Sequence, residues 1–278
     1  MRRILLTVLA VVASMLPATT AHADDPPRYR TYYSIFTRGQ QQIPYLDTTP
    51  YVPQGLTHWP ELDAMVVSYY HDGGGNARLT VLDRTTSRRI KTLTLDDTGH
   101  AGALATSRNF IWVATGGKVV RYAKSALAGA ADGATVTRNR AYSVLAASFM
   151  EISGDKMYVG AFDPDNSATA YRYSLDAAEE AHYDNHSFGV PSKVQGMAIT
   201  SAHFIWSRSW GRDNDSQIVV DPRNGAISRT VTAPNMSEDL ATVGGQLYVV
   251  YESGAKKYAD ADYKVRTIHH GPLSELIP

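Results

Sequence analysis

The chain has 278 residues and no cysteine, and its 27 basic side chains balance its 27 acidic ones. The missing cysteines exclude the disulfide scaffolds of small exported domains and every thiolate metal site. The balanced charge lacks the basic footprint that nucleic-acid binding requires, so we expect no nucleic-acid partner.

The N-terminus has the features of a secretory signal peptide over residues 1–23. Arg2 and Arg3 precede a short apolar run, and Ala21-His22-Ala23 provides a small-x-small cleavage site before Asp24. The apolar run is shorter than the roughly 20 residues that span a bilayer. We therefore expect cleavage after Ala23 and a secreted, extracellular protein with no membrane span. The alternative is an uncleaved membrane anchor.

Residues 24–53 are interpreted as an N-terminal closing segment. They contain one strand-like run, Tyr32-Tyr33-Ser34-Ile35-Phe36, which is rich in good β formers. We expect this run to pair with the last sheet of the domain as an outer strand and so to cover an exposed edge.

From residue 54 onwards the sequence repeats itself. Ala101–Trp112 and Gln195–Trp206 share a second-position glycine, a Thr-Ser pair and Phe-Ile-Trp at one spacing. The same frame fits Ser148–Val159, Glu238–Val249 and, with a longer turn, the segment that starts at Gln54-Gly55. The units begin at residues 54, 101, 148, 195 and 238, at intervals of 47, 47, 47 and 43 residues. Such a period is typical of repeat architectures.

Each unit reads as four short β-strands separated by Gly-, Asn- and Asp-rich turns. The clearest are the second strands, predicted at Met65–Tyr70, Phe110–Thr115, Met157–Phe162, Phe204–Ser209 and Leu247–Glu252. Helical periodicity is nearly absent, and Lys124–Ala131 can make only one or two helical turns.

Four-stranded units of roughly 40–50 residues are the blades of β-propellers. We therefore predict an all-β fold, a five-bladed β-propeller of four-stranded blades over residues 54–278, closed by an N-terminal strand. The alternative is a two-sheet sandwich, which needs no regular repeat. With its Gln-Gly repeat starts, the chain resembles the secreted β-propeller proteins found among actinobacterial exports, a group with no assigned activity. It resembles no propeller enzyme family closely enough for catalytic residues to be carried over.

In a propeller, the entries to the innermost strands and the exits from the second strands share one face, where ligands usually bind. We predict a polar ligand pocket there, at the channel mouth near blades four and five, and lying between these two blades rather than on the channel axis. The candidate ligand-binding residues on this face are Gln54, Tyr69, Tyr70, Gln195, Arg208, Trp210, Arg212 and Asp239.

The two arginines of blade four are expected to meet the acids of blade five. Ordering a long arginine side chain near a channel costs conformational entropy, which a contact with a carboxylate or a ligand must offset. We therefore expect Arg208 or Arg212 to reach Glu238, Asp239 or Glu252. The other arginine would then be free for a ligand anion, with Trp210 as a stacking wall. The alternative is that these residues have only structural roles. The charged residues would then form a salt bridge between blades, and the Gln-Gly pairs would close a narrow ring.

Two classes of function are open. The first is a binding propeller for a small polar, anionic or carbohydrate ligand, or for another protein. The second is an extracellular hydrolase or lyase acting on a polymer or ester, with Glu238, Glu252 and His100 as acid/base groups. Carboxylates roughly 5–9.5 Å apart across a pocket favour glycosidase-like chemistry. Carboxylates held by Arg208 and Arg212 favour a binder or a structural network.

No organic cofactor is expected, and calcium is the one metal considered. Asp163 and Asp165 begin an oxygen-rich loop that is similar to the first half of a calcium loop, although its distal glutamate is missing. Asp and Asn are also the preferred residues of ordinary turns. His269 and His270, near the C-terminus, are expected at the surface.

Overall fold

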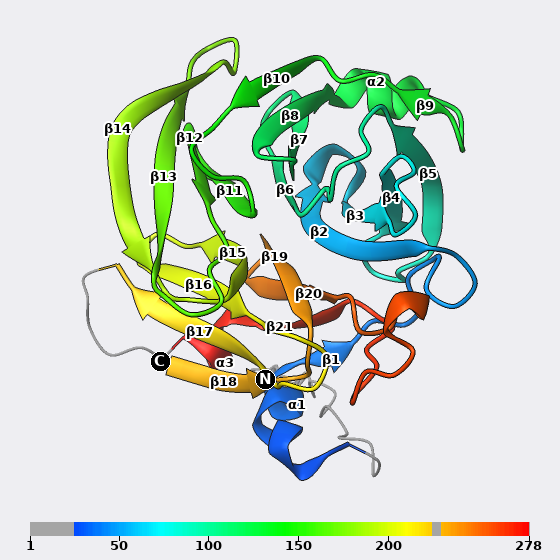
Figure 1. Ribbon diagram of the computed structural model, residues 1–278, viewed down its shortest axis with the longest axis vertical. Helices are drawn as coiled ribbons and strands as arrows, with labels where there is room; N and C mark the ends of the chain where they lie inside the picture. Colours follow the sequence, from blue (N-terminus) through cyan, green and yellow to red (C-terminus); the bar gives the residue numbers. More distant parts are fainter. Residues whose placement is uncertain (1–24, 224–228, 278) are drawn as a thin grey trace, which may run out of the picture.

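The β-forming segments of the repeat build five sheets around a common axis (Figure 1). The computed structural model describes residues 25–223 and 229–277. It confirms the predicted all-β, five-bladed β-propeller with four-stranded blades. The predicted signal peptide, residues 1–23, lies outside the described residues. Within the described part of the chain, no helix is long and apolar enough to cross a membrane.

The first two blades are interleaved at one point, because a short strand of blade one lies in the chain between the third and fourth strands of blade two. Blade one consists of β2 (Tyr51–Trp59), β3 (Ala64–His71), β4 (Arg78–Asp83) and β5 (Arg89–Leu95), with the short β9 (Thr135–Val136) added in parallel. Blade two consists of β6 (Ala103–Thr106), β7 (Phe110–Thr115), β8 (Lys118–Ala123) and β10 (Arg140–Ser143). Between β8 and β9 the predicted short helix is present as α2 (Lys124–Gly129).

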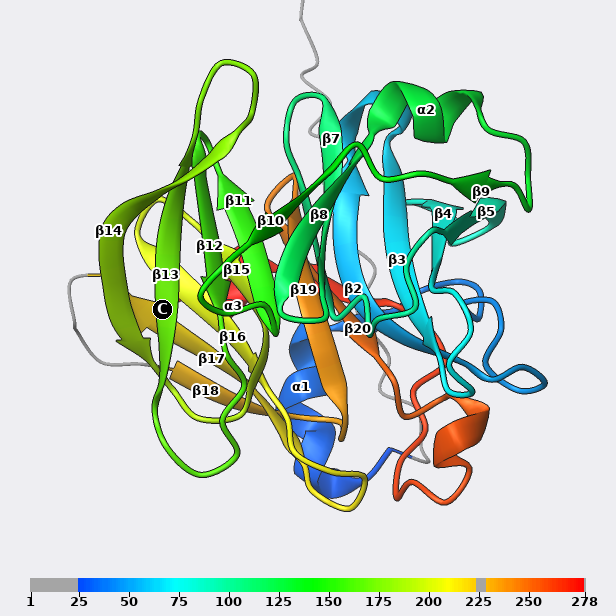
Figure 2. The ribbon, with the colours of Figure 1, turned by 45° about the horizontal axis from the view of Figure 1, so that its top comes forward.

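The next two blades are antiparallel meanders of the same design. Blade three consists of β11 (Phe149–Ser153), β12 (Lys156–Gly160), β13 (Ala168–Leu175) and β14 (Ala181–Val190). Blade four consists of β15 (Val194–Ile199), β16 (His203–Arg208), β17 (Ser216–Pro222) and β18 (Arg229–Ala233). Figure 2 shows β14 at the outer edge of blade three.

Blade five is assembled from both ends of the described chain. It consists of β19 (Ser237–Val243), β20 (Gln246–Tyr251), β21 (His269–Pro272) and β1 (Thr37–Arg38), and it is followed by the short α3 (Leu273–Leu276). Three-residue 3-10 turns occur at η1 (Pro27–Tyr29), η2 (Pro60–Leu62) and η3 (Lys256–Tyr258). Because β1 comes from the N-terminal side and β21 from the C-terminal side, their pairing closes the ring.

The first strand of each repeat lines the axis, as the repeat frame predicts. The inner strands β2, β6, β11, β15 and β19 each pack beside the inner strands of the two neighbouring blades (Figure 1). All five unit starts, from Gln54 to Glu238, lie within three residues of the first residue of an inner strand. They therefore meet at one end of the channel.

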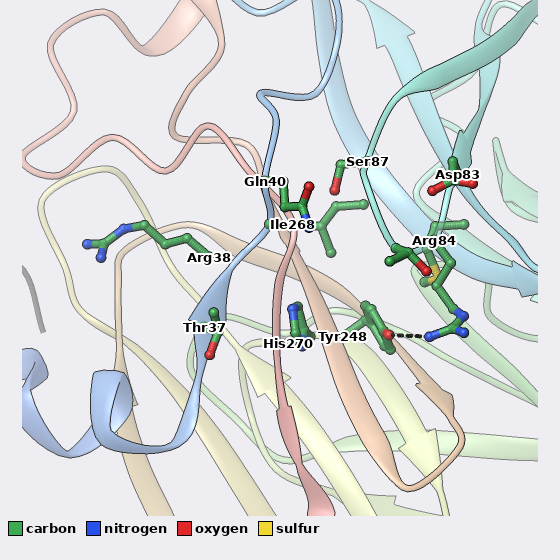
Figure 3. A pocket seen from close by; sticks show the side chains of 12 residues that line it. Thr37, Arg38, Gln40, Asp83, Arg84, Ser87, Tyr248, Ile268 and His270 are labelled. Atoms are coloured by element: carbon green, nitrogen blue, oxygen red, sulfur yellow. Dashed lines mark hydrogen bonds between the residues drawn. The ribbon is translucent and has the colours of Figure 1, made fainter. Parts of the chain in front are cut away.

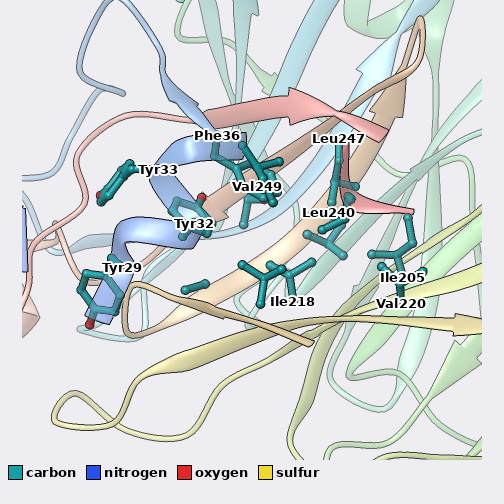
Figure 4. Close-up of a cluster of buried hydrophobic side chains, with 14 of the residues drawn as sticks. Tyr29, Tyr32, Tyr33, Phe36, Ile205, Ile218, Val220, Leu240, Leu247 and Val249 are labelled. Atoms are coloured by element: carbon teal, nitrogen blue, oxygen red, sulfur yellow. The ribbon is translucent and has the colours of Figure 1, made fainter. Parts of the chain in front are cut away.

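Apolar side chains fill the spaces between successive blades, because both faces of each sheet are covered by neighbours. Within the cluster between blades four and five, Ile205, Ile218 and Leu240 are fully buried (Figure 4). The same cluster receives Tyr32 and Phe36 from the N-terminal segment. The hydrophobic effect therefore acts between blades and holds the ring together.

The predicted strand Tyr32–Phe36 is wrong, because most of it belongs to the helix α1 (Arg30–Ile35). The buried residues Tyr29, Tyr32, Tyr33 and Phe36 have the i, i+3, i+4, i+7 spacing of a helix face. The Tyr32 and Phe36 rings stack with centroids 4.4 Å apart. Burying this aromatic face against blades four and five overrides the β propensity of the individual residues. The closing strand is the next segment, Thr37–Arg38, which pairs with His270 and His269.

The expected surface position of the His269-His270 pair is also wrong. His269 lies in β21 and is only 1% exposed. Its Nδ1 is 3.0 Å from the hydroxyl of Tyr32, which accepts a hydrogen bond from Tyr251 at 2.6 Å. His270 is half-buried. Both histidines are enclosed because the N-terminal segment covers β21.

Candidate functional site

Three of the five inner strands begin with a β-bulge, and the bulges coincide with the polar entry residues. The pairing register shifts between Pro53 and Leu56, between Val194 and Gly196, and between Ser237 and Leu240. Gln54, Gln195 and Glu238 with Asp239 are therefore the extra residues of these bulges. A bulge breaks the alternation of a strand and re-aims its side chains, which is why bulges are common beside binding sites.

A cavity of about 430 Å³ opens at this end of the channel. All five blades contribute to its wall, so it lies on the channel axis rather than between blades four and five, where the sequence suggested a pocket. Its polar and aromatic lining residues are Gln54, His100, Thr115, Ser148, Phe162, Gln195, Glu238, Glu252 and Tyr258. The volume is within the roughly 300–1,000 Å³ of small-ligand pockets.

The carboxyl groups of Glu238 and Glu252 are neighbours in the cavity wall. The protonated Glu238 carboxyl donates a hydrogen bond to Glu252. Burial, followed by the charge of Glu252, raises the pKa of Glu238 well above its usual range. Burial also raises the pKa of Glu252, to about 7, although it accepts hydrogen bonds from Tyr258 and Gln54. Two adjacent carboxyl groups in a desolvated site cannot both be ionised at neutral pH.

Two polar side chains, Gln54 and Tyr258, interact with Glu252. Gln54 is 6% exposed and donates through Nε2 to Glu252 Oε2 at 2.9 Å and to the carbonyl of Pro53 at 3.0 Å. The Tyr258 hydroxyl is also near Glu252 and lowers its pKa, and it interacts with Tyr70. Glu252 itself is half-buried, because the cavity leaves part of its side chain accessible.

His100 lies exposed at the rim of the cavity. Its ring stacks on Tyr70 with centroids 4.1 Å apart and an interplanar angle of 23°. Partial burial, followed by the nearby Lys257 cation, lowers the pKa of His100. Lys257 donates to the Tyr70 hydroxyl at 2.9 Å and pairs with Asp72 at 2.7 Å. A neutral imidazole at the rim can both donate and accept a hydrogen bond.

Asp239 is fully buried and acts as a joint between blades. Its Oδ2 accepts backbone N–H bonds from Leu56 at 2.9 Å and Leu104 at 3.0 Å, and its Oδ1 accepts from Leu240 at 3.0 Å. Burial raises the pKa of Asp239, while the three N–H donors favour its ionised form. Blades one, two and five are thus joined through one carboxyl group, which has no path to a ligand in the cavity.

The glycines of the Gln-Gly pairs allow close approach, which is the structural role considered for this motif. A Cβ on Gly55 would lie 2.8 Å from the carbonyl carbon of Ala103 in blade two. A Cβ on Gly196 would lie 2.5 Å from the Cα of Asp239 in blade five. Gln54 and Gln195, in contrast, face the cavity. Each pair therefore combines a packing residue with a cavity residue.

The arginines of blade four do not meet the acids of blade five, contrary to the sequence prediction. Arg208 donates to the carbonyl of Ser192 at 2.8 Å and to Gln217 at 2.7 Å. Arg212 is partly exposed and pairs with Asp260 at 2.6 Å. The excursion of residues 252–268 between β20 and β21 supplies this other carboxylate, which the repeat frame did not locate. Trp210 faces Lys193, with the ammonium 4.2 Å from the ring centroid.

Three other candidate residues lie away from the cavity. Tyr69 is fully buried in the core between blades one and five, because strand alternation turns it away from its neighbour Tyr70. Asp163 accepts the backbone N–H groups of Asp165 and Asn166 at 2.9 and 2.8 Å, which is an ordinary Asp turn. Within residues 25–223 and 229–277, no group of three or more His, Asp or Glu side chains is arranged to hold a metal ion.

Sequence reasoning missed Tyr258, Lys257 and Glu151. The first two belong to η3 in the long excursion of blade five, and the length of that excursion is the sequence signal that could have pointed to them. Glu151 lies on the inner strand β11 and accepts the N–H of Ile152 at 2.7 Å. Burial raises its pKa, and the charge of Asp239 acts in the same direction.

Neither of the two diagnostic geometries expected from the sequence is present. Glu238 and Glu252 hydrogen-bond each other, so they do not face each other across the roughly 5–9.5 Å gap of glycosidases. They are not held by Arg208 or Arg212 either. The site is a pair of neighbouring carboxyl groups with raised pKa values, accompanied by amide, phenol and imidazole groups.

The fold and this cavity define the class of protein, a five-bladed β-propeller with a polar channel mouth. No protein-family model and no curated protein matches the sequence. Among solved structures, the chain is similar to a GH43_1 enzyme from Xanthomonas citri, with 10% identity, coverage of 83% of this chain and 89% of that chain, and a TM-score of 0.53. At this identity the similarity shows the fold alone.

Two further solved structures match with lower TM-scores. A gluconolactonase from Xanthomonas campestris matches with 10% identity, coverage of 86% of this chain and 93% of that chain, and a TM-score of 0.44. A chain from a nidogen/laminin complex matches with 10% identity, coverage of 78% and 84%, and a TM-score of 0.47.

Proposed function

We propose that the protein is a carbohydrate-binding propeller whose channel-mouth cavity receives an uncharged, hydroxyl-rich ligand. The observation that carries the proposal is the Glu238–Glu252 pair in the wall of a ligand-sized cavity. A carboxyl pair with one proton offers both a donor and acceptors, which suits sugar hydroxyl groups. Its remaining negative charge disfavours an anionic ligand.

The groups around the pair support the same ligand class. Gln54 and Gln195 present amides, which donate and accept, and His100 presents a neutral imidazole at the rim. Phe162 and Tyr258 add aromatic surface to the wall, and such rings pack against the apolar faces of amphipathic ligands. The cavity therefore combines convergent polar groups with flat apolar surface.

A binding experiment on conservative variants tests this proposal. A panel of soluble neutral oligosaccharides is titrated into the wild type, Glu252→Gln and Gln54→Ala, and heat of binding is measured. We expect at least one oligosaccharide to bind the wild type and to bind Glu252→Gln about tenfold or more weakly, because hydrogen bonds to charged groups contribute about 1.5–3 kcal/mol each. Arg212→Ala, whose guanidinium pairs with Asp260, is the matched control and should bind like the wild type. Equal binding by all four proteins would contradict the proposal.

Acid/base hydrolysis of the bound polymer is the second candidate function. The raised pKa of Glu252, to about 7, favours it, because a general acid or base works best when its pKa is near the operating pH. In this scheme the protonated carboxyl of the pair gives its proton to the leaving oxygen as the C–O bond of the substrate breaks, the ionised carboxylate takes a proton from the attacking water, and His100 is the third acid/base candidate. Recovery of the ligand intact after prolonged incubation separates the binder from the hydrolase, which would release new reducing ends.

We also propose that the protein acts outside the cell after cleavage behind Ala23. The proposal rests on the sequence of residues 1–23. Mass spectrometry of protein from the culture medium should find Asp24 as the first residue. A chain retained in the membrane fraction with its N-terminus intact would contradict it.

A further inference from the structure

A second cavity, of about 350 Å³, lies where blade five meets blade one at the closure of the ring (Figure 3). We name it the closure pocket. The residues that matter for its chemistry are Gln40, Arg84, Ser87, Tyr248 and His270. None of them lines the channel-mouth cavity, whose wall is made by the entries of the inner strands.

We propose that the closure pocket is a second binding site, specific for a neutral hydroxyl-rich ligand of monosaccharide size. The inference goes beyond the proposed function and does not depend on it, because the two cavities share no residue. Three properties of the pocket support it: an aromatic stack, polar groups without hydrogen-bond partners in the described residues, and arginines that are already paired with carboxylates.

The aromatic stack comes from two neighbouring strands of blade five. His270 of β21 is the cross-strand neighbour of Tyr248 of β20, and their rings stack with centroids 5.3 Å apart at 26°. Thr37 of β1 is the neighbour of His270 on the other side. Figure 3 shows the two rings between Thr37 and Arg84 at the pocket. Half-buried His270 thus offers ring surface and ring nitrogens together.

Three polar side chains of the pocket, Gln40, Ser87 and His270, have no hydrogen-bond partner within the described residues. Ser87 is only 7% exposed, yet its hydroxyl forms no hydrogen bond within the described residues. The imidazole of His270 and the amide of Gln40 likewise have no hydrogen-bond partner in the described part of the chain. Buried polar groups of folded proteins are nearly always hydrogen-bonded to protein, water or ligand. The Ser87 hydroxyl, on an otherwise buried residue, is therefore left to bond with what occupies the cavity, either water or a polar ligand.

Both cations of the pocket are already paired with carboxylates, and its remaining charged group, Asp83, is a carboxylate that accepts hydrogen bonds from Thr86. Arg84 forms a fork with the carboxylate of Asp63 at 2.7 and 2.9 Å, and Arg38 pairs with Asp25. Arg84 also donates to the Tyr248 hydroxyl at 3.2 Å, which leaves the proton of that hydroxyl for a ligand oxygen. Neutralised cations do not select an anion. Groups that each donate and accept match the hydroxyl groups of a sugar.

Ligand-observed NMR with D-glucose, D-galactose and D-xylose tests the inference. Saturation transfer from the protein to each sugar is measured for the wild type, His270→Phe, Gln40→Ala, Gln41→Ala and Glu252→Gln. His270→Phe keeps a ring beside Tyr248 but removes both nitrogens. Gln40→Ala changes an exposed side chain with no hydrogen-bond partner in residues 25–223 and 229–277, so this variant should fold like the wild type. It therefore keeps the test possible if His270→Phe does not fold. Gln41→Ala is the matched neighbour outside the pocket lining.

We expect at least one of the sugars to bind the wild type and to bind both His270→Phe and Gln40→Ala about fivefold or more weakly, which is the factor for one lost hydrogen bond. Gln41→Ala and Glu252→Gln should retain binding at the closure pocket. Absence of saturation transfer for all three sugars would overturn the inference, and so would full retention in the two pocket variants. Loss of all monosaccharide binding in Glu252→Gln alone would assign binding to the channel mouth and overturn the closure pocket while supporting the proposed function.

Discussion

The inner ring of strands and the exposed periphery use the same residue types in opposite ways. At the inner ring, Asp239 is fully buried, is bonded only to backbone N–H groups, and has a raised pKa. At the periphery, the Arg212 guanidinium lowers the pKa of the exposed Asp260. The difference shows that distance from solvent decides whether a carboxyl group in this fold is a structural joint, a member of a neighbouring carboxyl pair or a solvated ion-pair partner.

Glycines differ between the two regions in the same manner. Gly196, on the inner strand β15, faces the backbone of blade five at a distance that a Cβ cannot occupy. Gly189, on the outer strand β14, would place a Cβ in open space. Crowding at the axis arises because five strands converge there, whereas the outer strands diverge.

The largest expected effect is at the buried joint. Asp239→Ala should lower the free energy of unfolding by about 3 kcal/mol or more, because three buried backbone N–H groups lose their acceptor. Asp239→Asn keeps an acceptor oxygen and should recover a substantial part of the loss. Chemical denaturation with both variants measures the difference. Equal stability of Asp239→Ala and the wild type would show that the carboxyl group does not join the blades.

The next largest effect on the free energy of unfolding is expected from substituting the glycine at the axis. Gly196→Ala should lower the free energy of unfolding by about 2 kcal/mol, because its Cβ displaces the backbone of β19. Gly189→Ala should stay within about 0.5 kcal/mol of the wild type, as surface substitutions do. Denaturant midpoints of the two variants check this. Similar losses at both sites would remove the distinction between axis and periphery.

The carboxyl pair predicts a pH dependence of intermediate size. The pKa of Glu252 is raised in the folded state, so its stabilising contribution is complete below the unfolded value of about 4.3 and is lost as the pH rises through about 7. Between pH 5 and pH 8 the wild type should therefore lose on the order of 1–2 kcal/mol that Glu252→Gln does not lose.

The difference between the two proteins is the quantity to measure, by thermal unfolding at each pH. Buried His269, whose pKa is lowered to about 3, acts in the opposite direction, but it does so equally in both proteins. Parallel stability curves for the wild type and Glu252→Gln would mean that the pair does not hold an extra proton in the folded state.

The smallest expected effect is at the periphery. Arg212→Ala removes an exposed ion pair with Asp260 and should change the free energy of unfolding by less than about 1 kcal/mol. The change should shrink further at high salt, because exposed pairs are screened. A loss as large as that of Asp239→Ala would show that the arginine has a structural role that its exposure does not indicate.

Local patterns in the sequence were sufficient for the architecture. The regular spacing of the five unit starts, together with the β-forming second strands, predicted five blades and the order of strands within them. The same spacing predicted that Gln54, Gln195 and Glu238 meet at one end of the axis, because equivalent positions of a closed repeat must form a ring. Helical spacing of Tyr29, Tyr32, Tyr33 and Phe36 was also present, but β propensity was given more weight.

Tertiary structure decided the partners of each charge and the position of each cavity. The bulges re-aim Gln54 and Glu238, and the excursion of blade five brings Tyr258 to Glu252 and Asp260 to Arg212. The closure pocket exists only because β1 and β21, from opposite ends of the chain, lie side by side. A repeat period specifies which residues are equivalent, whereas contacts between loops of different length and between distant chain segments depend on packing that no local pattern encodes.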